Sequence, residues 1–217
     1  LTAARGGYGV LLNNGSGNED VLIAGNTFSG ISGAWTHAVG LEGPTPGAVV
    51  TGNTFSSLTA VSVDNTAVFF EKNPVGSSVT VEGNFFNNVG YGVAIHPNDL
   101  PGGSNGLNYI VDASQNWWGS SCGPTAALAD VGKNVTFVPW YTTTEGVLSG
   151  AATTTTFAAG TSTADMNTAI ACAVPGSTFK FDAGSHNGGL VVPASRTNLT
   201  FTLLDGAVLN ASGPCFN

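Results

Sequence analysis

Charged residues are scarce in this chain of 217 residues, at 8% of the total, or about a third of the share usual in globular proteins. The net charge is −8, and the five basic residues are scattered: Arg5, Lys72, Lys133, Lys180 and Arg196. Without a basic patch, nucleic-acid binding is not expected. A polyanionic substrate would also be repelled over most of the surface.

Long apolar runs and cysteines are also few. No apolar run approaches the roughly 20 residues that span a bilayer, so we expect no membrane span. The three cysteines, Cys122, Cys172 and Cys215, show no CxxC or His/Cys metal spacing, and we expect neither a metal nor a cofactor. One disulfide and one leftover thiol would suit an exported protein, and all three pairings stay open.

The chain is instead rich in small and apolar residues. Hydrophobic residues make up 42%, and there are 31 glycines together with frequent Asn, Thr and Ser. Surface helices favour Glu, Lys and Arg, so this composition favours tightly turning β structure. Disorder is not expected, because disordered chains are poor in apolar residues.

Four segments repeat one pattern, a short alternating strand, a polar turn with Asn, and an aromatic residue. They are VLIAGNTFSG (21–30), AVVTGNTFSS (48–57), VTVEGNFFNN (79–88) and YIVDASQNWWG (109–119). Their asparagines, Asn26, Asn53, Asn84 and Asn116, lie 27, 31 and 32 residues apart. A second ladder lies between the turns: YGVLLN (8–13), HAVGLE (37–42), AVSVDN (60–65) and YGVAIH (91–96).

Two ladders with the same period predict a solenoid, and we expect an all-β, right-handed parallel β-helix. Strands of successive coils would stack about 4.8 Å apart around inward Val, Ile, Leu and Phe. Asn tolerates left-handed turns, and its amide can bond to the Asn of the next coil. The aromatic residues would form one column: Phe28, Phe55, Phe86 and Trp118.

The segment ASQNWWGSSCGPT (113–125), followed by VTFVPWYT (135–142), resembles the closing turn of the right-handed β-helix repeat family. The resemblance covers residues 1–142 and implies a pectate-lyase-like fold. That family is common in bacterial and archaeal surface proteins and includes polysaccharide lyases and hydrolases. Because one fold hosts many chemistries, the resemblance indicates the fold more strongly than the function.

The rest of the chain resembles the start of a second β-helix. Residues 143–160 are interpreted as a Thr/Ala/Gly-rich junction, and residues 161–217 as an N-terminal-type cap with first coils. A short amphipathic capping helix is expected near 163–173, because Met166, Ala169, Ile170 and Ala173 share one face. Ser162 or Thr163 would cap it. Strands are expected at 178–181, 189–192, 199–204 and 207–209.

A closing motif before a cap has three explanations: a fragment of a longer tandem array, a subunit of an end-to-end filament, or a natural permutation. Open strand edges are templates for pairing, and a head-to-tail contact that does not close generates a fibre. The residues expected at the self-assembling ends are Gly7, Tyr8, Val10, Leu12, Val208, Cys215 and Phe216.

Candidate chemistry lies where the second ladder ends. In the expected register Glu42, Asp64 and His96 form one outward stripe with Asn13. Glu42 and Asp64 would then lie roughly 5 Å apart, the separation in retaining glycosidases, and His96 could act as acid or base. No Lys or Arg is expected on the ladder. The alternative is that polar residues merely end the strands. Trp117 or Trp118 could stack on a sugar, although one is expected in the core.

We therefore expect a secreted or cell-surface structural protein, not an enzyme, that assembles head to tail into a filament or sheath. Its partner would be another copy of itself, with a cell-surface glycan as a further candidate. One alternative is a carbohydrate-active enzyme or glycan-binding module that uses Glu42, Asp64 and His96. Another is an adhesin segment of a tandem β-helix array. The single TTTT run at 153–156 argues against an ice-binding array.

Overall fold

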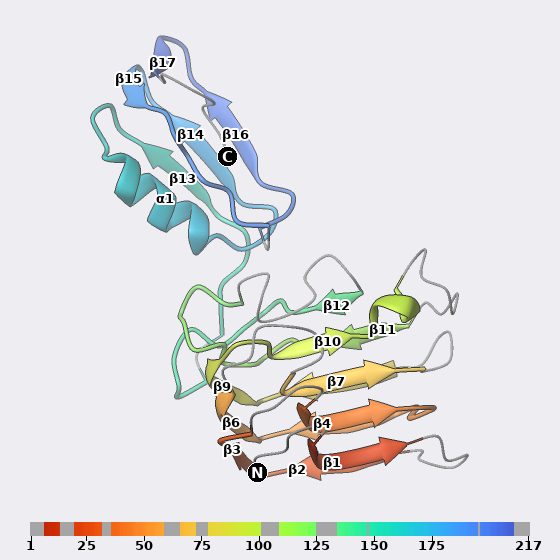
Figure 1. The fold of residues 1–217 in the computed structure, drawn as a ribbon. Helices are drawn as coiled ribbons and strands as arrows, with labels where there is room; N and C mark the ends of the chain where they lie inside the picture. Colours follow the sequence, from red (N-terminus) through yellow and green to blue (C-terminus); the bar gives the residue numbers. More distant parts are fainter. Residues whose placement is uncertain are drawn as a thin grey trace. The chain divides into compact units, whose positions relative to one another are not determined.

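The computed structural model describes residues 7–13, 20–31, 36–58, 66–72, 78–100, 109–124, 134–146, 148–194 and 196–210. The chain divides into two compact units, residues 1–148 (unit 1) and residues 149–217 (unit 2). All strand pairs between the described strands are parallel. The expected all-β parallel β-helix with one short α-helix is thereby confirmed (Figure 1).

The described residues of unit 1 form three parallel sheets. The first has the order β1-β4-β7-β10 and consists of β1 (Gly7–Asn13), β4 (Thr36–Glu42), β7 (Val68–Glu71) and β10 (Val93–Ile95). The second has the order β12-β11-β8-β5-β2, with β2 (Leu22–Ala24), β5 (Val49–Thr51), β8 (Ser78–Glu82), β11 (Ile110–Asp112) and β12 (Val135–Thr136). The third consists of β3 (Thr27–Ser29), β6 (Thr54–Leu58) and β9 (Phe85–Val89). A short 3-10 helix, η1 (Pro97–Asp99), follows β10.

Apolar side chains at matching register positions form the core of unit 1. In the first sheet two such columns, all at most 1% exposed, are Val39–Val68–Val93 and Leu41–Phe70–Ile95. Burial of one such side chain stabilises the fold by roughly 1.5–3 kcal/mol. Nearly every residue of β4, β7 and β10 is buried, on both sides of this sheet.

The predicted asparagine ladder is present. Asn53 Oδ1 accepts hydrogen bonds from the backbone and side-chain amides of Asn26 at 2.9 and 3.1 Å. Asn84 does the same for Asn53, both at 3.0 Å, and Asn116 for Asn84 at 2.8 and 3.0 Å. Asn53, Asn84 and Asn116 are fully buried. The ladder satisfies the polar groups at the turn between the second and third sheets, where an unpaired group would be costly.

The aromatic column is confirmed as well. The ring centroids of Phe28 and Phe55 lie 5.2 Å apart, those of Phe55 and Phe86 5.1 Å, and those of Phe86 and Trp118 4.8 Å. Interplanar angles of 8°, 10° and 18° make all three pairs stacked. Because Trp118 continues this column, its neighbour Trp117 is directed to the outer face.

The two segments that carry the family resemblance contact each other at Trp140. This side chain is 1% exposed, and its indole N–H donates to the Ser121 carbonyl at 3.0 Å. Gly123 has a φ of +72°, and a Cβ there would lie 2.6 Å from a ring carbon of Trp140. Glycine is thus required both for the left-handed backbone and for the close approach of the ring.

In unit 2 the residues that the structure describes form two sheets and α1 (Thr163–Ala171). The larger sheet has the order β13-β14-β16, with β13 (Thr154–Phe157), β14 (Thr178–Phe181) and β16 (Thr200–Leu203). The smaller pairs β15 (Gly184–Asn187) with β17 (Ala207–Asn210). Helix α1 connects β13 to β14, so it takes the place of further strands in the coil that β13 begins.

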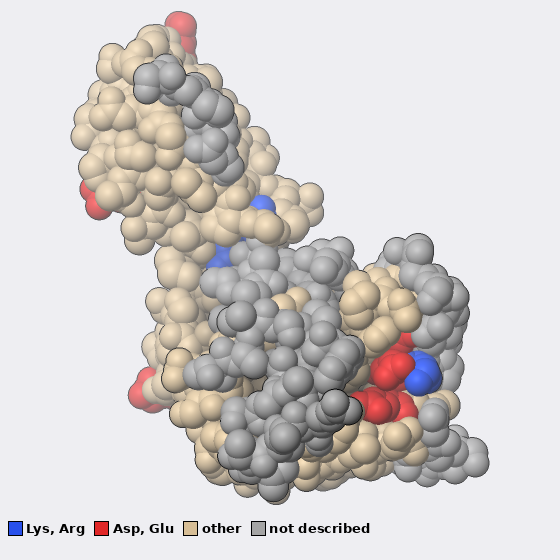
Figure 2. All heavy atoms as spheres, in the orientation of Figure 1, with Lys and Arg blue, Asp and Glu red and all other residues tan. Residues whose placement is uncertain are grey.

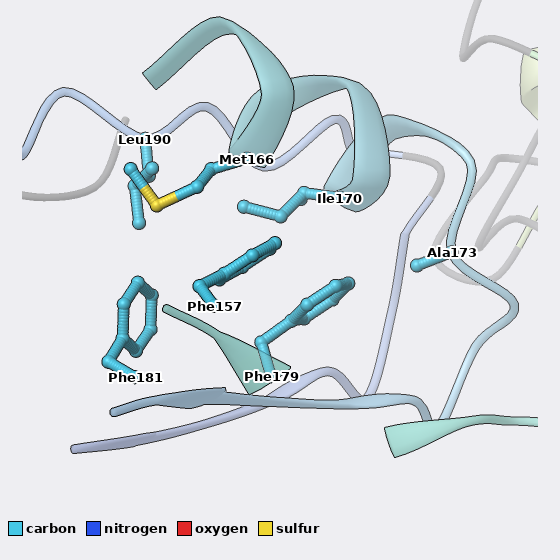
Figure 3. Packing of buried hydrophobic residues seen from close by; sticks show 7 residues of the cluster. All are labelled: Phe157, Met166, Ile170, Ala173, Phe179, Phe181 and Leu190. Carbon is cyan, nitrogen blue, oxygen red and sulfur yellow. The ribbon is translucent and has the colours of Figure 1, made fainter. Parts of the chain in front are cut away.

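Helix α1 covers the core of unit 2, as predicted. Ser162 is its N-cap, and its Oγ accepts from the Asp165 N–H at 3.1 Å. Met166 and Ile170 are fully buried and lie over the rings of Phe157 and Phe179 (Figure 3). The amphipathic pattern is therefore explained by packing against the first coil, which provides most of the stability of a helix this short.

Several expected elements differ from those observed. Thr154–Phe157, within the stretch interpreted as a junction, forms β13 and pairs with β14. The expected strand 189–192 is not among the named strands, and β15 precedes it. In the first sheet β7 (Val68–Glu71) occupies the place that we assigned to residues 60–65. Residues 60–65 themselves lie outside the described part of the chain.

Candidate functional site

Four polar residues occupy one edge of the first sheet. Asn13 pairs with Glu42, and Glu42 pairs with Glu71. His96 follows Ile95, the partner of Phe70, and its N–H donates to the Phe70 carbonyl at 2.8 Å. Adjacent strands lie about 4.8 Å apart, so Glu42 and Glu71 are held one rung apart on the outer side of the sheet.

The Tyr8 hydroxyl donates a hydrogen bond to Glu42 Oε1. Burial raises the pKa of Tyr8, and the hydrogen bond to Glu42 raises it further, so this phenol remains a proton donor. Gly40 makes the contact possible, because a Cβ at that position would lie 2.7 Å from two ring carbons of Tyr8. The contact fixes one oxygen of Glu42 as an acceptor.

Lys72 supplies a positive charge beside the second carboxylate. Its Nζ lies 2.8 Å from Glu71 Oε1, with the two side chains 50% and 19% exposed. The hydrogen bond and charge of Glu71 raise the pKa of Lys72, with smaller contributions from Glu42 and Asp99. The Lys72 N–H donates to Asp99 Oδ2, and Asp99 is only 1% exposed. A basic residue therefore lies directly after the ladder, beside Glu71.

An aromatic cluster lies beside the carboxylates. His37 stacks on Phe69 with ring centroids 4.2 Å apart and contacts Tyr8 at 5.4 Å. Burial lowers the pKa of His37 to about 4, so its ring is neutral near pH 7. Its Nδ1 accepts from the Thr66 N–H at 3.3 Å. His96 contacts Phe69 edge to face at 6.0 Å, and its Nδ1 accepts from the Asn98 N–H at 3.2 Å.

These contacts define what we call the acidic edge: Tyr8, Glu42, Glu71, Lys72, His96 and Asp99. On the visible face of unit 1, acidic side chains gather beside a basic one (Figure 2). Glu42, Glu71 and His96 are partly exposed, whereas Asp99 is buried. The exposed carboxylates are thus available to a ligand, while Asp99 holds the backbone of Lys72.

The sequence placed Glu42 and His96 on this edge and assigned the rung between them to Asp64. That assignment is wrong, because the residue that pairs with Glu42 on the next strand is Glu71. Asp64 itself lies outside the described residues. A regular spacing could have revealed Glu71, since Asn13, Glu42 and Glu71 follow one another at intervals of 29 residues. Tyr8 and Asp99 carry no comparable signal, because their contacts depend on the fold.

The residues expected at the self-assembling ends have different positions. In β1, Gly7 is buried and Tyr8 contacts Glu42, while Val10 and Leu12 pair with the core residues Val39 and Leu41. Val208 pairs with the exposed Ser185 and is itself 52% exposed, so it faces outward. Cys215 and Phe216 lie outside the described residues.

Cys122 and Cys172 are each disulfide-bonded, while Cys215 lies outside the described residues. Within the described ranges no group of three or more His, Cys, Asp or Glu side chains could hold a metal ion. None of the described helices is long and apolar enough to cross a membrane. Comparison of the chain with protein-family models, curated proteins and solved structures finds no match.

Proposed function

We propose that unit 1 is a polysaccharide-hydrolysing β-solenoid whose two working carboxylates are Glu42 and Glu71. The register that holds them on adjacent strands is the observation that carries this proposal. One rung is about 4.8 Å, and retaining glycosidases hold their two carboxyl groups about 5–5.5 Å apart. Like charges directly opposite each other on neighbouring strands destabilise a sheet, and here the Tyr8 hydroxyl and Lys72 offset that cost at Glu42 and Glu71.

The surrounding residues support a division of roles. Glu42 accepts from the Tyr8 hydroxyl, which orients its carboxylate as a nucleophile for the anomeric carbon. Glu71 would protonate the leaving glycosidic oxygen and later activate the water that releases the sugar. For the first step Glu71 must carry a proton, so its ion pair with Lys72 would open as the sugar binds and a proton from solvent would replace the ammonium group. His37 is neutral and buried and would support Tyr8 through ring contact.

The proposal is tested by measuring reducing ends released from a panel of neutral polysaccharides. We expect Glu42→Gln and Glu71→Gln each to lower kcat at least a hundredfold without loss of fold. The matched control is Glu82→Gln, because Glu82 is a partly exposed carboxylate at the end of β8 in another sheet. Asp64→Asn tests the earlier assignment. Absence of hydrolysis on every polysaccharide, or full activity in both Gln variants, would refute the proposal.

We also propose that the solenoid is of the right-handed, pectate-lyase-like type and is secreted or displayed at a cell surface. The Asn ladder, the aromatic column and the Trp140 contact lie in the segments that resemble this family. Two disulfide-bonded cysteines suit an oxidising compartment. Localisation of the native protein by cell fractionation tests the second part of the proposal.

A second candidate function is end-to-end assembly, and the position of Leu203 favours it. Leu203 pairs with the fully buried Phe181 and so faces the inside of the coil, yet it is 51% exposed. Phe201, which pairs with the buried Phe179, is also partly exposed. We propose that a coil of another copy of the chain covers this surface, which would complete the apolar columns and the backbone ladder.

Val208 offers a matched control for this assembly. It is 52% exposed, close to the 51% of Leu203, but faces outward. We expect Leu203→Asp to abolish concentration-dependent association in sedimentation velocity, whereas Val208→Asp leaves it unchanged. Fibres in electron micrographs of the wild type would support the proposal. A wild type that remains monomeric at high concentration, or equal effects of the two variants, would refute it.

A further inference from the structure

The third sheet of unit 1 carries a partly exposed aromatic pair on its outer face. Phe85 and Trp117 form a parallel bridge on adjacent rungs, and both side chains are partly exposed. Their neighbours Phe86 and Trp118 face inward and are each 1% exposed. The burial of Trp118 in the core column thus forces Trp117 onto the surface, on a different sheet from the acidic edge.

The Trp117 ring is held in a fixed orientation. Its indole N–H donates to Asn87 Oδ1 at 3.0 Å, and Asn87 lies on the exposed side of β9. The hydrogen bond lies in the plane of the indole, so it fixes the ring while leaving its faces for stacking. A ring that is fixed before binding loses little conformational entropy when a ligand stacks on it.

The surroundings of this pair are polar but uncharged. Thr27 and Thr54 continue the row of Phe85 across β3 and β6. A second row contains Ser29, Ser56 and Asn87. Strands β3, β6 and β9 contain no Asp, Glu, Lys or Arg, although the whole chain has a net charge of −8.

We propose that this face is a binding platform for a neutral polysaccharide, separate from the acidic edge. Sugars combine apolar C–H faces, which stack on aromatic rings, with hydroxyl groups that bond to Ser, Thr and Asn. The second row has a hydroxyl or amide group at each rung of β3, β6 and β9, about 4.8 Å apart, so a repeating ligand laid across these strands meets similar donors and acceptors. An uncharged face matches an uncharged chain better than a uronic-acid polymer.

Affinity electrophoresis in native gels tests the platform, with soluble xylan, glucomannan and hydroxyethyl cellulose as neutral probes and polygalacturonate as the anionic probe. We expect at least one neutral polysaccharide to retard the wild type, and Trp117→Ala to weaken that binding at least tenfold. Leu22→Ala should bind normally, because Leu22 is an exposed apolar residue, 65% exposed, on the second sheet. Thermal unfolding confirms that each variant is folded.

Further variants separate this platform from the proposed hydrolytic site. The double variant Glu42→Gln/Glu71→Gln should keep its retardation, so a failure of hydrolysis does not affect this test. If Trp117→Ala does not fold, Asn87→Ala replaces it, since it frees the ring without removing the aromatic side chain, and weaker binding is again expected. Retardation by no neutral polysaccharide, or by polygalacturonate alone, would overturn the proposal. The proposal would also be overturned if Trp117→Ala, or Asn87→Ala in its place, is folded and binds as well as the wild type.

Discussion

Asn84 Oδ1 accepts hydrogen bonds from both the backbone and the side-chain amide of Asn53, each at 3.0 Å, on the neighbouring coil. The Asn84 amide in turn donates to the carbonyls of Val50 and Glu82 at 2.8 and 3.0 Å. A single side chain therefore satisfies polar groups on two coils at once. Because both asparagines are fully buried, water cannot replace these partners.

Replacement of Asn84 by Ala should strongly destabilise unit 1. The backbone N–H of Asn53 and the carbonyl of Val50 would lose partners in the interior, and each such loss costs about 1–3 kcal/mol. We expect the free energy of unfolding to fall by at least about 2 kcal/mol in urea titrations. Asn26→Ala is the matched control, because Asn26 ends the described ladder and is exposed. Equal losses in both variants would contradict this account.

The aromatic column predicts a graded response to truncation. Phe86 is 1% exposed and stacks between Phe55 and Trp118, whereas Phe28 is 9% exposed and stacks on Phe55 alone. We expect Phe86→Ala to lower the free energy of unfolding by about 3–5 kcal/mol. Phe28→Ala should have a smaller effect, because fewer contacts are lost. Chemical denaturation of both variants checks the order, and the reverse order would refute it.

The sequence predicted those parts of the fold in which one residue type recurs in each coil and contacts the same type in the next coil. Each Asn bonds to the next Asn, and each ring stacks on the next ring, so spacing alone revealed these two columns. The first sheet was harder, because AVSVDN alternates apolar and polar residues as a half-buried strand does, whereas VFFE does not, and only the pairing of Glu42 with Glu71 shows that VFFE is the strand. Strand β15, GSHN, lacks apolar alternation, since its buried inward side chain is His186.

The contacts of the acidic edge were beyond the reach of sequence patterns. Tyr8 and Glu42 are 34 positions apart in the sequence. Their hydrogen bond depends on glycine at position 40, because a Cβ there would clash with the Tyr8 ring. Asp99 meets Lys72 because η1 turns back toward the end of β7. Each of these contacts joins two different residue types at one place in the solenoid, so it produces no repeated pattern in the sequence.

The capping helix should be more sensitive to its buried face than to its cap. Met166 is fully buried in the core of unit 2, and Met166→Ala should lower the free energy of unfolding by about 2–5 kcal/mol. Ser162→Ala removes the N-cap bond and the exposed hydrogen bond that Ser162 Oγ donates to Asp165 Oδ2 at 2.7 Å, and should cost about 0.5–2 kcal/mol. Ala164 is exposed on the same helix, so Ala164→Ser serves as a control. Thermal unfolding followed by circular dichroism measures all three, and a larger effect of the cap would contradict the role of α1 as a cover.

His37 should make the fold less stable as the pH falls below neutrality. Burial lowers its pKa to about 4, from 6.5 for an unperturbed side chain. Between these values the unfolded chain binds a proton that the folded chain excludes, so protonation favours unfolding. The stabilisation is complete above the unfolded pKa and declines as the pH falls, by about 2 kcal/mol at pH 5.

A comparison with His37→Gln isolates this effect from all other titrating groups. Gln cannot titrate but retains an acceptor for the Thr66 N–H, with which His37 Nδ1 now bonds at 3.3 Å. The wild type should be more stable than the variant at pH 7.5, because the ring contact with Phe69 is intact. That advantage should shrink by about 2 kcal/mol at pH 5, since only the wild type gains a proton on unfolding. Urea titrations at the two pH values measure the difference, and an advantage that does not change with pH would show that His37 is protonated equally in both states.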